Sequence, residues 1–343
     1  MKIALDIMGG DNAPDSNLYA VVDYINNTPK SESGIILVGD ESLARKFFSK
    51  NNFTSDRVYF EHTTEVIEMN EKKPSIAFKS KPNSSMIKAI NLVKEQNAQA
   101  VISAGNTGAL LSSSLFILGK ISNVNRPALA SYIPTNRKGV LLCDCGANLN
   151  VKPKHLVQFS VMSQSYLTCI HQIDNPSVGL LNIGAEENKG SELVIEGYQM
   201  MSDKVKNFIG NVEAREILDG KCDIVITDGF TGNIVLKLTE GWIGHFGTWI
   251  SETLDKDNSP NESIKNQINK IFSSLDYEEH GFAPFLGVRG IVLKCHGSST
   301  KISITNTLQS AEILCMKNMV AKMENQINET YGEEKSSDEI KLN

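Results

Sequence analysis

Short aliphatic runs alternate with longer amphipathic segments along the whole chain. Consecutive apolar residues are typical of strands that are covered on both faces, as in a parallel sheet, and the segments between them have helical spacing. The alternation therefore predicts an α/β fold: helices packed on a mostly parallel central sheet, in three α/β/α layers. The runs of strand length are Lys2–Met8, Gly34–Val38, Ala100–Ser103, Gly139–Cys143, Val178–Ile183, Asp223–Thr227 and Ile291–Lys294.

The segment from Asn233 to about Leu275 breaks this alternation, because it has helical spacing and no convincing strand. Residues 255–260 hold Asp, Asn, Ser and Pro, which are typical of a turn between two helices. We therefore predict a helical hairpin, inserted at 233–278, that projects from the sheet. On its first helix we expect dimer or core contacts from Trp242, Phe246, Trp249 and Ile250, and on its second an apolar stripe of Ile264, Ile268, Ile271 and Leu275.

The length of 343 residues fits one large or two modest domains. Because no linker or internal repeat is visible, we predict a single catalytic domain over residues 1–323. Residues 324–343 hold six acidic residues and two lysines with few apolar groups, which predicts an acidic, flexible tail.

Charge and cysteine content exclude several classes of protein. Lys and Arg number 34 against 40 Asp and Glu, and the net charge of −6 argues against nucleic-acid binding. The six cysteines include no C-x-x-C pair, so we expect buried thiols in a reducing cytosol. No signal peptide or apolar stretch of about 18 residues is present. We expect a cytoplasmic protein, at most peripheral at the inner face of the cell membrane.

Six of the expected strands end in glycine together with Asp, Asn, Ser or Thr. In a parallel sheet the carboxyl ends of the strands lie along one edge, where ligands of these folds bind. Glycine lets backbone amides approach a ligand, and helix N-termini favour anions. The pattern predicts a polar cleft for a phosphate-bearing or oxyanionic ligand. These loops begin at Asp6, Ser103, Asp144, Asn182, Thr227 and Cys295.

Several familiar chemistries have no motif in this sequence. There is no P-loop, no G-x-G-x-x-G dinucleotide fingerprint and no G-x-S-x-G nucleophile elbow. The six histidines show neither metal-ligand spacing nor an H-x-x-x-x-D acyltransferase box, so we predict no metal.

Eight distinctive blocks occur in one order along the chain, and together they resemble the bacterial phosphate acyltransferase family, PlsX, over nearly the full length. The blocks are Asp6–Pro14, Lys81–Met86, Ser103–Leu111, Arg126–Ala130, Asn182–Leu193, Gly210–Leu218, Thr227–Gly241 and Ala283–Ser299.

The resemblance implies transfer of a fatty acyl group from acyl carrier protein to inorganic phosphate. The acyl phosphate would then feed glycerol-3-phosphate acylation in phospholipid synthesis, through a membrane acyltransferase. It also implies an architecture similar to phosphate acetyltransferase and isocitrate dehydrogenase, assembled as a homodimer. Family members are expected to touch the membrane through the hairpin, but Asp255 and Asp257 at its tip predict weak or no direct binding to anionic lipid.

A thioester is already activated, so phosphate oxygen can attack its carbonyl without a cofactor or an acyl-enzyme. For phosphate binding we expect the backbone amides of Gly9 and Gly10, together with Asn106, Thr107 and Arg126. A buried ion pair would make Arg126 look the same in sequence. We expect further substrate contacts from Asp6, Asp11, Asn148, Glu186, Thr231, Ser298 and Ser299, with helix capping as the alternative role of the first two.

Four residues are expected to take part in catalysis: Lys189, Asp228, Asn233 and His296. Lys189 would supply positive charge, or would pair on the surface with Glu186 or Glu187. Asp228 and Asn233 flank Gly229–Gly232, whose amides could form an oxyanion cradle or simply be capped at a helix start. His296 could protonate the departing thiolate, or be a structural histidine bonded to the backbone.

Acyl carrier protein is acidic, so an acidic enzyme needs a local basic face for docking. The segment 72–82 carries Lys72, Lys73, Lys79 and Lys81 and no acidic residue, although a solvated loop would have the same composition. Two rival functions stay open: a phosphate acetyltransferase-like enzyme that uses acetyl-CoA, and a non-catalytic scaffold that recruits the next acyltransferase.

Overall fold

The computed structural model describes residues 1–135, 139–256 and 281–332. These residues form two compact units, and each contains a run of hydrogen-bonded neighbouring strands. The first comprises residues 1–129, 161–174 and 281–332, and the second comprises 130–135, 139–160 and 175–256. The predicted single-domain organisation stays a prediction.

The sheet of the first unit has the strand order β3-β2-β1-β4-β11-β10. The first five of these strands are mutually parallel, and β10 runs antiparallel to β11. The strands are β1 (Lys2–Asp6), β2 (Gly34–Gly39), β3 (Val58–His62), β4 (Ala100–Ser103), β10 (Phe282–Leu286) and β11 (Ile291–Cys295).

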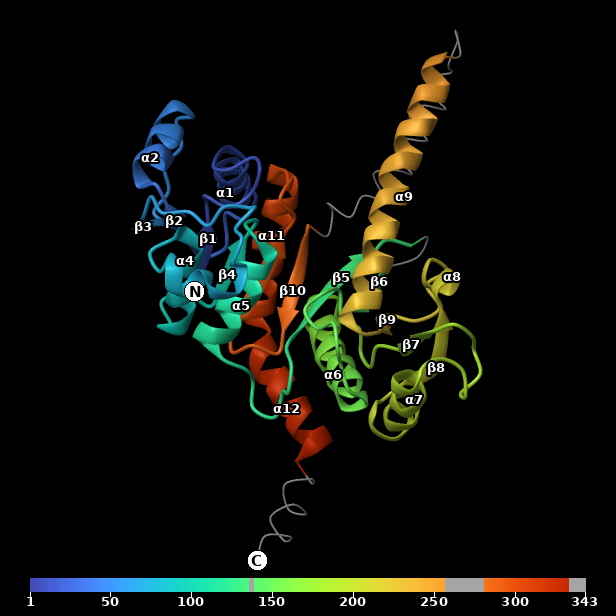
Figure 1. Ribbon diagram of the computed structural model, residues 1–343. Coiled ribbons are helices and arrows are strands. Elements are labelled where there is room, and N and C mark those ends of the chain that lie inside the picture. The colour runs from blue at the N-terminus through green and yellow to red at the C-terminus, as the bar shows by residue number, and fades with distance from the viewer. Residues whose placement is uncertain (136–138, 257–280, 333–343) are drawn as a thin grey trace, which may run out of the picture. The chain divides into compact units, whose positions relative to one another are not determined.

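Helices cover this sheet in two groups. Helix α4 packs with α5 and α1 packs with α11 (Figure 1). Because the chain reverses direction across the sheet after β3 and crossovers are right-handed, the two groups lie on opposite faces. The helices are α1 (Asp15–Asn27), α2 (Glu41–Lys50), the short η1 (Pro74–Ile76) and α3 (Ala77–Ser80), α4 (Ser85–Lys94), α5 (Thr107–Leu118), α11 (Lys301–Met316) and α12 (Met319–Tyr331).

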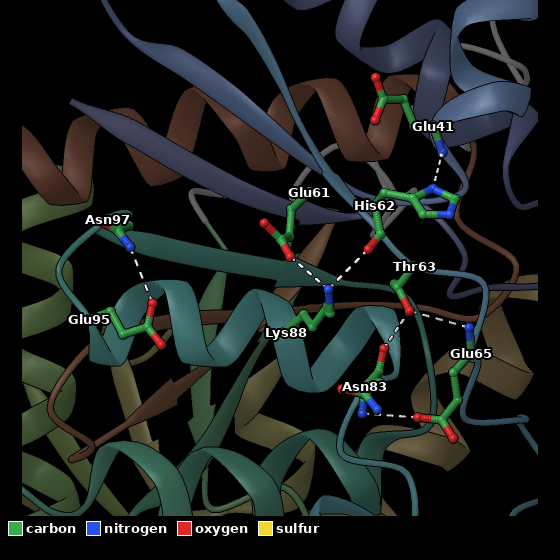
Figure 2. A network of polar contacts seen from close by, with 9 residues as sticks. All are labelled: Glu41, Glu61, His62, Thr63, Glu65, Asn83, Lys88, Glu95 and Asn97. Carbon is green, nitrogen blue, oxygen red and sulfur yellow. Dashed lines mark hydrogen bonds and ion pairs between the residues drawn. The ribbon is translucent and has the colours of Figure 1, made fainter.

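A network of polar contacts fastens the end of β3 to α4 (Figure 2). Lys88 on α4 forms an ion pair with Glu61 at 2.7 Å and donates to the carbonyl of His62 at 3.0 Å. The backbone amide of Asn83 donates to Glu65 Oε2 at 2.9 Å. These contacts join residues 61–65 to residues 83–88, on either side of the segment that contains the four lysines.

The second unit has the strand order β5-β6-β9-β7-β8, in which β5 is antiparallel to β6 and the other neighbours are parallel. Aliphatic side chains of β6, β7, β8 and β9 form its core with Ile217 and Cys222. Two elements are divided between the two units: residues 130–133 of β5 (Ala128–Ile133) and 153–160 of α6 (Pro153–Ile170) belong to the second unit. Its other elements are β6 (Val140–Cys143), β7 (Val178–Asn182), α7 (Glu192–Lys204), β8 (Phe208–Glu213), α8 (Ala214–Ile217), β9 (Ile224–Ile226) and α9 (Gly229–Lys256).

The α/β fold with its mostly parallel sheet is confirmed, and so is the burial of the cysteines: five are buried and Cys315 is half-buried. Helix α9 confirms the first helix of the predicted hairpin, but it continues through Asp255 and Lys256, where the sequence predicts the start of the turn. The rest of the turn and the second helix lie outside the described residues. In the described residues no helix has the length and apolarity needed to cross a membrane.

Two expectations about these regions are wrong. Trp242, Phe246 and Trp249 are 53%, 48% and 55% exposed, so they are not core contacts; a dimer contact stays a prediction. Residues 333–343 lie outside the described residues, and residues 324–331 are not a flexible tail, because α12 continues to Tyr331. Its Met323, Ile327 and Tyr331 recur at four-residue spacing and are buried, and this apolar face stabilises the helix despite the acidic residues around it.

Candidate active site

Three of the predicted loops meet at the carboxyl edge of the first unit's sheet. Strands β1, β4 and β11 are parallel neighbours, and Asp6 is in register with Ser103, which is in register with Lys294. The loops that follow these three residues touch: the backbone amide of Asp11 donates to the carbonyl of Gly297 at 2.7 Å. A Cβ placed on Gly9 would lie 2.7 Å from the amide nitrogen of Gly105.

The buried side chain of Asp6 joins the first two of these loops through hydrogen bonds. Its carboxylate is 1% exposed and accepts from the backbone amides of Met8 and Gly9, both at 3.1 Å, and from the Ser103 hydroxyl at 2.7 Å. Burial raises the pKa of this carboxyl, against the opposing effect of hydrogen bonds from Ser85, Ser103 and the two amides. Asp6 therefore positions the loops and is enclosed by protein donors.

The backbone amides of these loops divide into those that already donate a hydrogen bond and those that do not. Gly9 donates its amide to Asp6, so that amide is already used. The amides of Gly10, Thr107 and Gly108 donate to no acceptor among the residues that the structure describes. Gly10 also has a φ of +106°, a conformation that glycine adopts without strain. Three open amides thus lie on the loops that meet at this edge.

Asn106 caps α5, and both polar atoms of its side chain have a partner within the protein. Its Oδ1 accepts from the backbone amide of Ala109 at 2.9 Å, and its Nδ2 donates to the carbonyl of Met69 at 2.8 Å. Thr107, the first residue of the helix, is exposed. The first turn of α5 therefore offers backbone amides, and the Asn106 side chain holds the turn in place.

The third loop holds His296, Ser298 and Ser299. Nδ1 of His296 lies 2.7 Å from the hydroxyl of Ser298 and accepts from the Ser298 amide at 3.3 Å, and the imidazole is exposed. Ser299 is only 3% exposed, and its hydroxyl accepts from Ser303 at 3.2 Å. Asp11 is exposed at the mouth of the same loops. Ser299 is thus a buried structural residue, whereas His296, Ser298 and Asp11 are accessible.

Lys294 is a residue of this edge that the sequence patterns did not single out. It is 6% exposed, and its ammonium group donates to the carbonyls of Ala104, at 3.3 Å, and Cys295. A charged residue at the end of an otherwise apolar strand was the available signal. Its ammonium places a positive charge beneath the loop that leads into α5.

Arg126 lies near the amino ends of the parallel strands, whereas the three loops follow their carboxyl ends. Phe282 of β10 pairs with Cys295 at the carboxyl end of β11, and the other end of β10, Leu286, pairs with Ala128. Arg126 precedes Ala128 and is exposed. The prediction that Arg126 contributes to the phosphate loops is therefore wrong, because the antiparallel strand β10 carries the chain away from them.

In the second unit, the loop after β6 packs against the start of α9. Asp144 is fully buried, and its carboxylate accepts from the amides of Gly146, Ala147 and Asn148 at 2.8–3.2 Å. Asn148 is 6% exposed and its side chain also donates to Asp144 at 2.8 Å. A Cβ on Gly229 would lie 2.6 Å from the carbonyl oxygen of Asn148. Asn148 is thus part of the scaffold, and Gly229 is required by close backbone approach.

The amides of Gly229–Gly232 are not available as an oxyanion cradle. Gly229 donates to the carbonyl of Asn148 at 2.8 Å, and Gly232 donates to the carbonyl of Asp228 at 2.9 Å. Asp228 Oδ1 accepts from the amides of Phe230 and Thr231, both at 2.9 Å, and its Oδ2 accepts from the Thr231 hydroxyl at 2.7 Å. The residues therefore have the alternative role, in which Asp228 caps α9.

Two predicted catalytic residues of the second unit stay open to solvent. The Asn233 side chain is exposed, at the position that faces Gly146 across the loop, where a Cβ on Gly146 would be 3.6 Å away. Lys189 and Glu186 are exposed, and within the described part of the chain Lys189 forms no ion pair. The loop of Lys189 is held instead by Asn182, whose Nδ2 donates to the Lys189 carbonyl at 2.9 Å. The alternative role of Lys189, an ion pair with Glu186 or Glu187, is therefore not found in the structure.

The four lysines of the predicted docking segment are not equivalent. Lys81 forms an ion pair with Glu71 at 3.4 Å and donates to the carbonyl of Val66 at 3.0 Å, so it holds the segment together. Lys72, Lys73 and Lys79 are exposed. In the described residues there is no group of three or more His, Cys, Asp or Glu side chains that could hold a metal ion.

Comparison with solved structures defines the class of fold. A phosphotransacetylase from Streptococcus pyogenes has a TM-score of 0.60 over 94% of both chains at 14% identity. A branched-chain phosphotransacylase from Enterococcus faecalis V583 has a TM-score of 0.54 over 91% of this chain and 98% of its own at 16% identity. At such low identity these likenesses show the fold alone, and the fold is phosphotransacetylase-like.

Comparison at the sequence level shows the family. The family described as fatty acid synthesis protein matches residues 1–322. A phosphate acyltransferase of Clostridioides difficile is 45% identical over 99% of both chains, and one of Halothermothrix orenii is 40% identical over 96% of this chain and 99% of its own. The chain belongs to the phosphate acyltransferase family, PlsX, and is an acyltransferase, as the resemblance predicted.

Proposed function

We propose that the chain transfers a fatty acyl group from the thioester of acyl carrier protein to inorganic phosphate. A phosphate oxygen attacks the thioester carbonyl carbon, the carbon–sulfur bond breaks, and the carrier leaves as a thiolate that takes up a proton. The products are acyl phosphate and free carrier protein. The observation that carries this proposal is the near-full-length identity to proteins named phosphate acyltransferase.

The three-loop edge of the first unit is the proposed phosphate site. Open amides of Gly10, Thr107 and Gly108 can donate to phosphate oxygens, and the start of a 12-residue helix favours negative charge. The buried ammonium of Lys294 adds a positive charge beneath the same loops. The exposed His296 is the proposed proton donor to the thiolate.

Direct transfer, without an acyl-enzyme, is supported by the state of the cysteines. A nucleophilic thiol needs a lowered pKa, whereas burial raises the pKa of Cys222 to about 12 and of Cys295 to about 11. Burial likewise raises the pKa of Cys315 to about 12, and it raises those of Cys145 and Cys169. These thiols are held in their protonated, unreactive form.

The test is phosphate-dependent release of carrier thiol from long-chain acyl carrier protein, with acyl phosphate trapped as the hydroxamate by added hydroxylamine. The acyl chain carries a radioactive label in this assay. Thiol release without phosphate, or transfer of the labelled acyl chain to the enzyme itself, would exclude direct transfer. Acetyl-CoA is the parallel donor: preference for it would favour the phosphate acetyltransferase-like alternative. No turnover with either donor would favour the scaffold.

Lys189 and Asn233 are the side chains of the second unit for which we propose catalytic roles. Lys189 is an exposed cation with no ion pair in the described part of the chain, and Asn233 is an exposed amide at the start of α9. We expect Lys189→Gln and Asn233→Ala to lower kcat at least tenfold without changing the far-UV circular dichroism spectrum. Lys237→Gln, which removes an exposed lysine paired with Glu240, is the matched control.

We further propose that Lys72, Lys73 and Lys79 dock acyl carrier protein. The adjacent apolar surface includes Phe116, which is 64% exposed and stacks on Phe78 at 4.5 Å. Charge reversal of Lys79 should raise the Michaelis constant for acyl carrier protein and leave that for phosphate unchanged. Reversal of Lys46, an exposed lysine on α2, should change neither. Equal effects of both reversals would exclude a specific docking face.

Assembly and location remain proposals too. We propose a cytoplasmic homodimer that supplies acyl phosphate to a membrane acyltransferase acting on glycerol-3-phosphate, with at most weak contact of its own with lipid. Sedimentation equilibrium tests the dimer, and co-sedimentation with anionic vesicles tests the membrane contact.

A further inference from the structure

An apolar groove runs between α8 and α9 in the second unit, where Figure 1 shows the two helices. Its volume is about 460 Å³, and ten residues that the structure describes line it, none of them ionisable. Two of these ten carry hydroxyl groups, and both hydroxyls have partners: Thr135 accepts from Gly139 at 3.2 Å and Thr239 donates to the carbonyl of Val235 at 2.9 Å. The groove therefore offers a ligand hydrocarbon surface without charge.

The groove follows one face of α9. Its lining residues Val235, Leu238, Trp242 and Ile243 recur at the spacing of a single helical face. At a rise of about 1.5 Å per residue, this face extends from about 9 to about 21 Å beyond Gly229 along the helix. Gly229, the first residue of α9, packs against the polar loop that contains Asn148. The groove therefore begins about 9 Å along the helix from this polar loop.

We propose that this groove binds the hydrocarbon chain of the acyl substrate, with the thioester end directed toward the start of α9. The proposal rests on the proposed function, which supplies a substrate with a long apolar chain. The lack of charged side chains among the described lining residues matches a hydrocarbon and disfavours a phosphate or a peptide.

The size of the groove favours a single chain over a protein partner. Its volume lies within the range of about 300–1,000 Å³ that small-molecule pockets occupy. Affinity should therefore rise about fourfold for each added methylene until the groove is filled.

A matched pair of variants tests the groove by binding, independently of turnover. Leu238 lines the groove and is 61% exposed, whereas Ile234 lies one turn earlier on α9, is 51% exposed and does not line it. We expect Leu238→Gln to weaken binding of parinaric acid, a fluorescent long-chain fatty acid, by about fivefold or more, and Ile234→Gln to leave it unchanged. Both side chains are exposed, so neither change should prevent folding.

A second variant tests chain length. Ala214 is an exposed residue at the start of α8 that lines the groove, and Ala214→Phe should narrow it. We expect the ratio of kcat/KM for long-chain over short-chain acyl donors to fall about tenfold, with the short-chain value retained. Equal losses for both chain lengths, or equal probe binding by Leu238→Gln and Ile234→Gln, would overturn the proposal.

Other occupants of the groove give different results. If Leu238→Gln lowers the dimer fraction in sedimentation equilibrium while probe binding is unchanged, the groove is an interface between copies and the proposal is overturned. If it abolishes pelleting with phosphatidylglycerol vesicles instead, again with unchanged probe binding, the groove contacts lipid and the proposal is also overturned. A protein without phosphate-dependent turnover could still bind the probe more weakly as Leu238→Gln than as Ile234→Gln. That result would support the groove as a hydrocarbon site and reject the proposed function.

Discussion

The buried carboxylate of Asp6 should be the side chain whose removal most disturbs the first unit's loops. Asp6→Ala leaves four donors without this acceptor: the amides of Met8 and Gly9 and the side chains of Ser85 and Ser103. Each buried unsatisfied group costs about 1–3 kcal/mol, so the free energy of unfolding should fall by about 3 kcal/mol or more. Asp6→Asn keeps an oxygen for the two amides and should cost about 1 kcal/mol.

The pH dependence separates the two variants further. Because burial raises the pKa of Asp6, the folded chain binds this proton more tightly than the unfolded chain does. The carboxyl therefore contributes stability at acidic pH that is lost as the pH rises through the folded-state pKa. Asparagine does not titrate, so the stability of Asp6→Asn relative to the wild type should rise over that same interval.

The assay must report on the first unit. Both tryptophans, Trp242 and Trp249, lie on α9 in the second unit, so their fluorescence follows the wrong part of the chain. Urea unfolding by far-UV circular dichroism, combined with hydrogen exchange at the amides of Met8 and Gly9, follows the affected loops. If Asp6→Ala and Asp6→Asn are equally stable, and those amides exchange as slowly as in the wild type, the role assigned to Asp6 is refuted.

Three further predictions follow from the same contacts. Arg126→Ala should leave the Michaelis constant for phosphate unchanged, because Arg126 lies at the far edge of its sheet; a rise of tenfold in steady-state kinetics would contradict this placement. Asp228→Ala should lower the free energy of unfolding of the second unit by about 0.5–2 kcal/mol through loss of the α9 cap, and Asp228→Asn should cost much less, as followed by tryptophan fluorescence in urea. Gly229→Ala should cost about 1–3 kcal/mol in the same assay, because its methyl group would overlap the carbonyl of Asn148; a wild-type midpoint would show that the loop gives way freely.

The division between what the sequence predicts and what it leaves open follows the range of the interactions involved. The period of apolar residues depends on neighbours within a few positions, so it predicts β1, β4 and α9 and the parallel sheet directly. The glycine-rich ends of strands are equally local, which is why the sequence predicts the loops that begin at Asp6, Ser103 and Asp144.

The assignment of roles within those loops needed the tertiary structure. Asp6, Asp11 and Asp228 look alike in sequence. In the structure, however, Asp6 is enclosed by donors from its own loop and from Ser103 of β4, Asp11 is exposed, and Asp228 caps a helix. Arg126 was misplaced because the antiparallel path of β10 depends on pairings far apart in the chain.

Local residue patterns thus determined the elements of this protein and the chemistry available at their ends. Long-range strand order and burial decided which of those groups are open to a ligand, because an amide or carboxylate is available only when no distant part of the chain has already satisfied it. Lys294 shows this most clearly: its sequence marks a strand end, and only the packing of β11 against β4 makes it a buried charge beneath the loops.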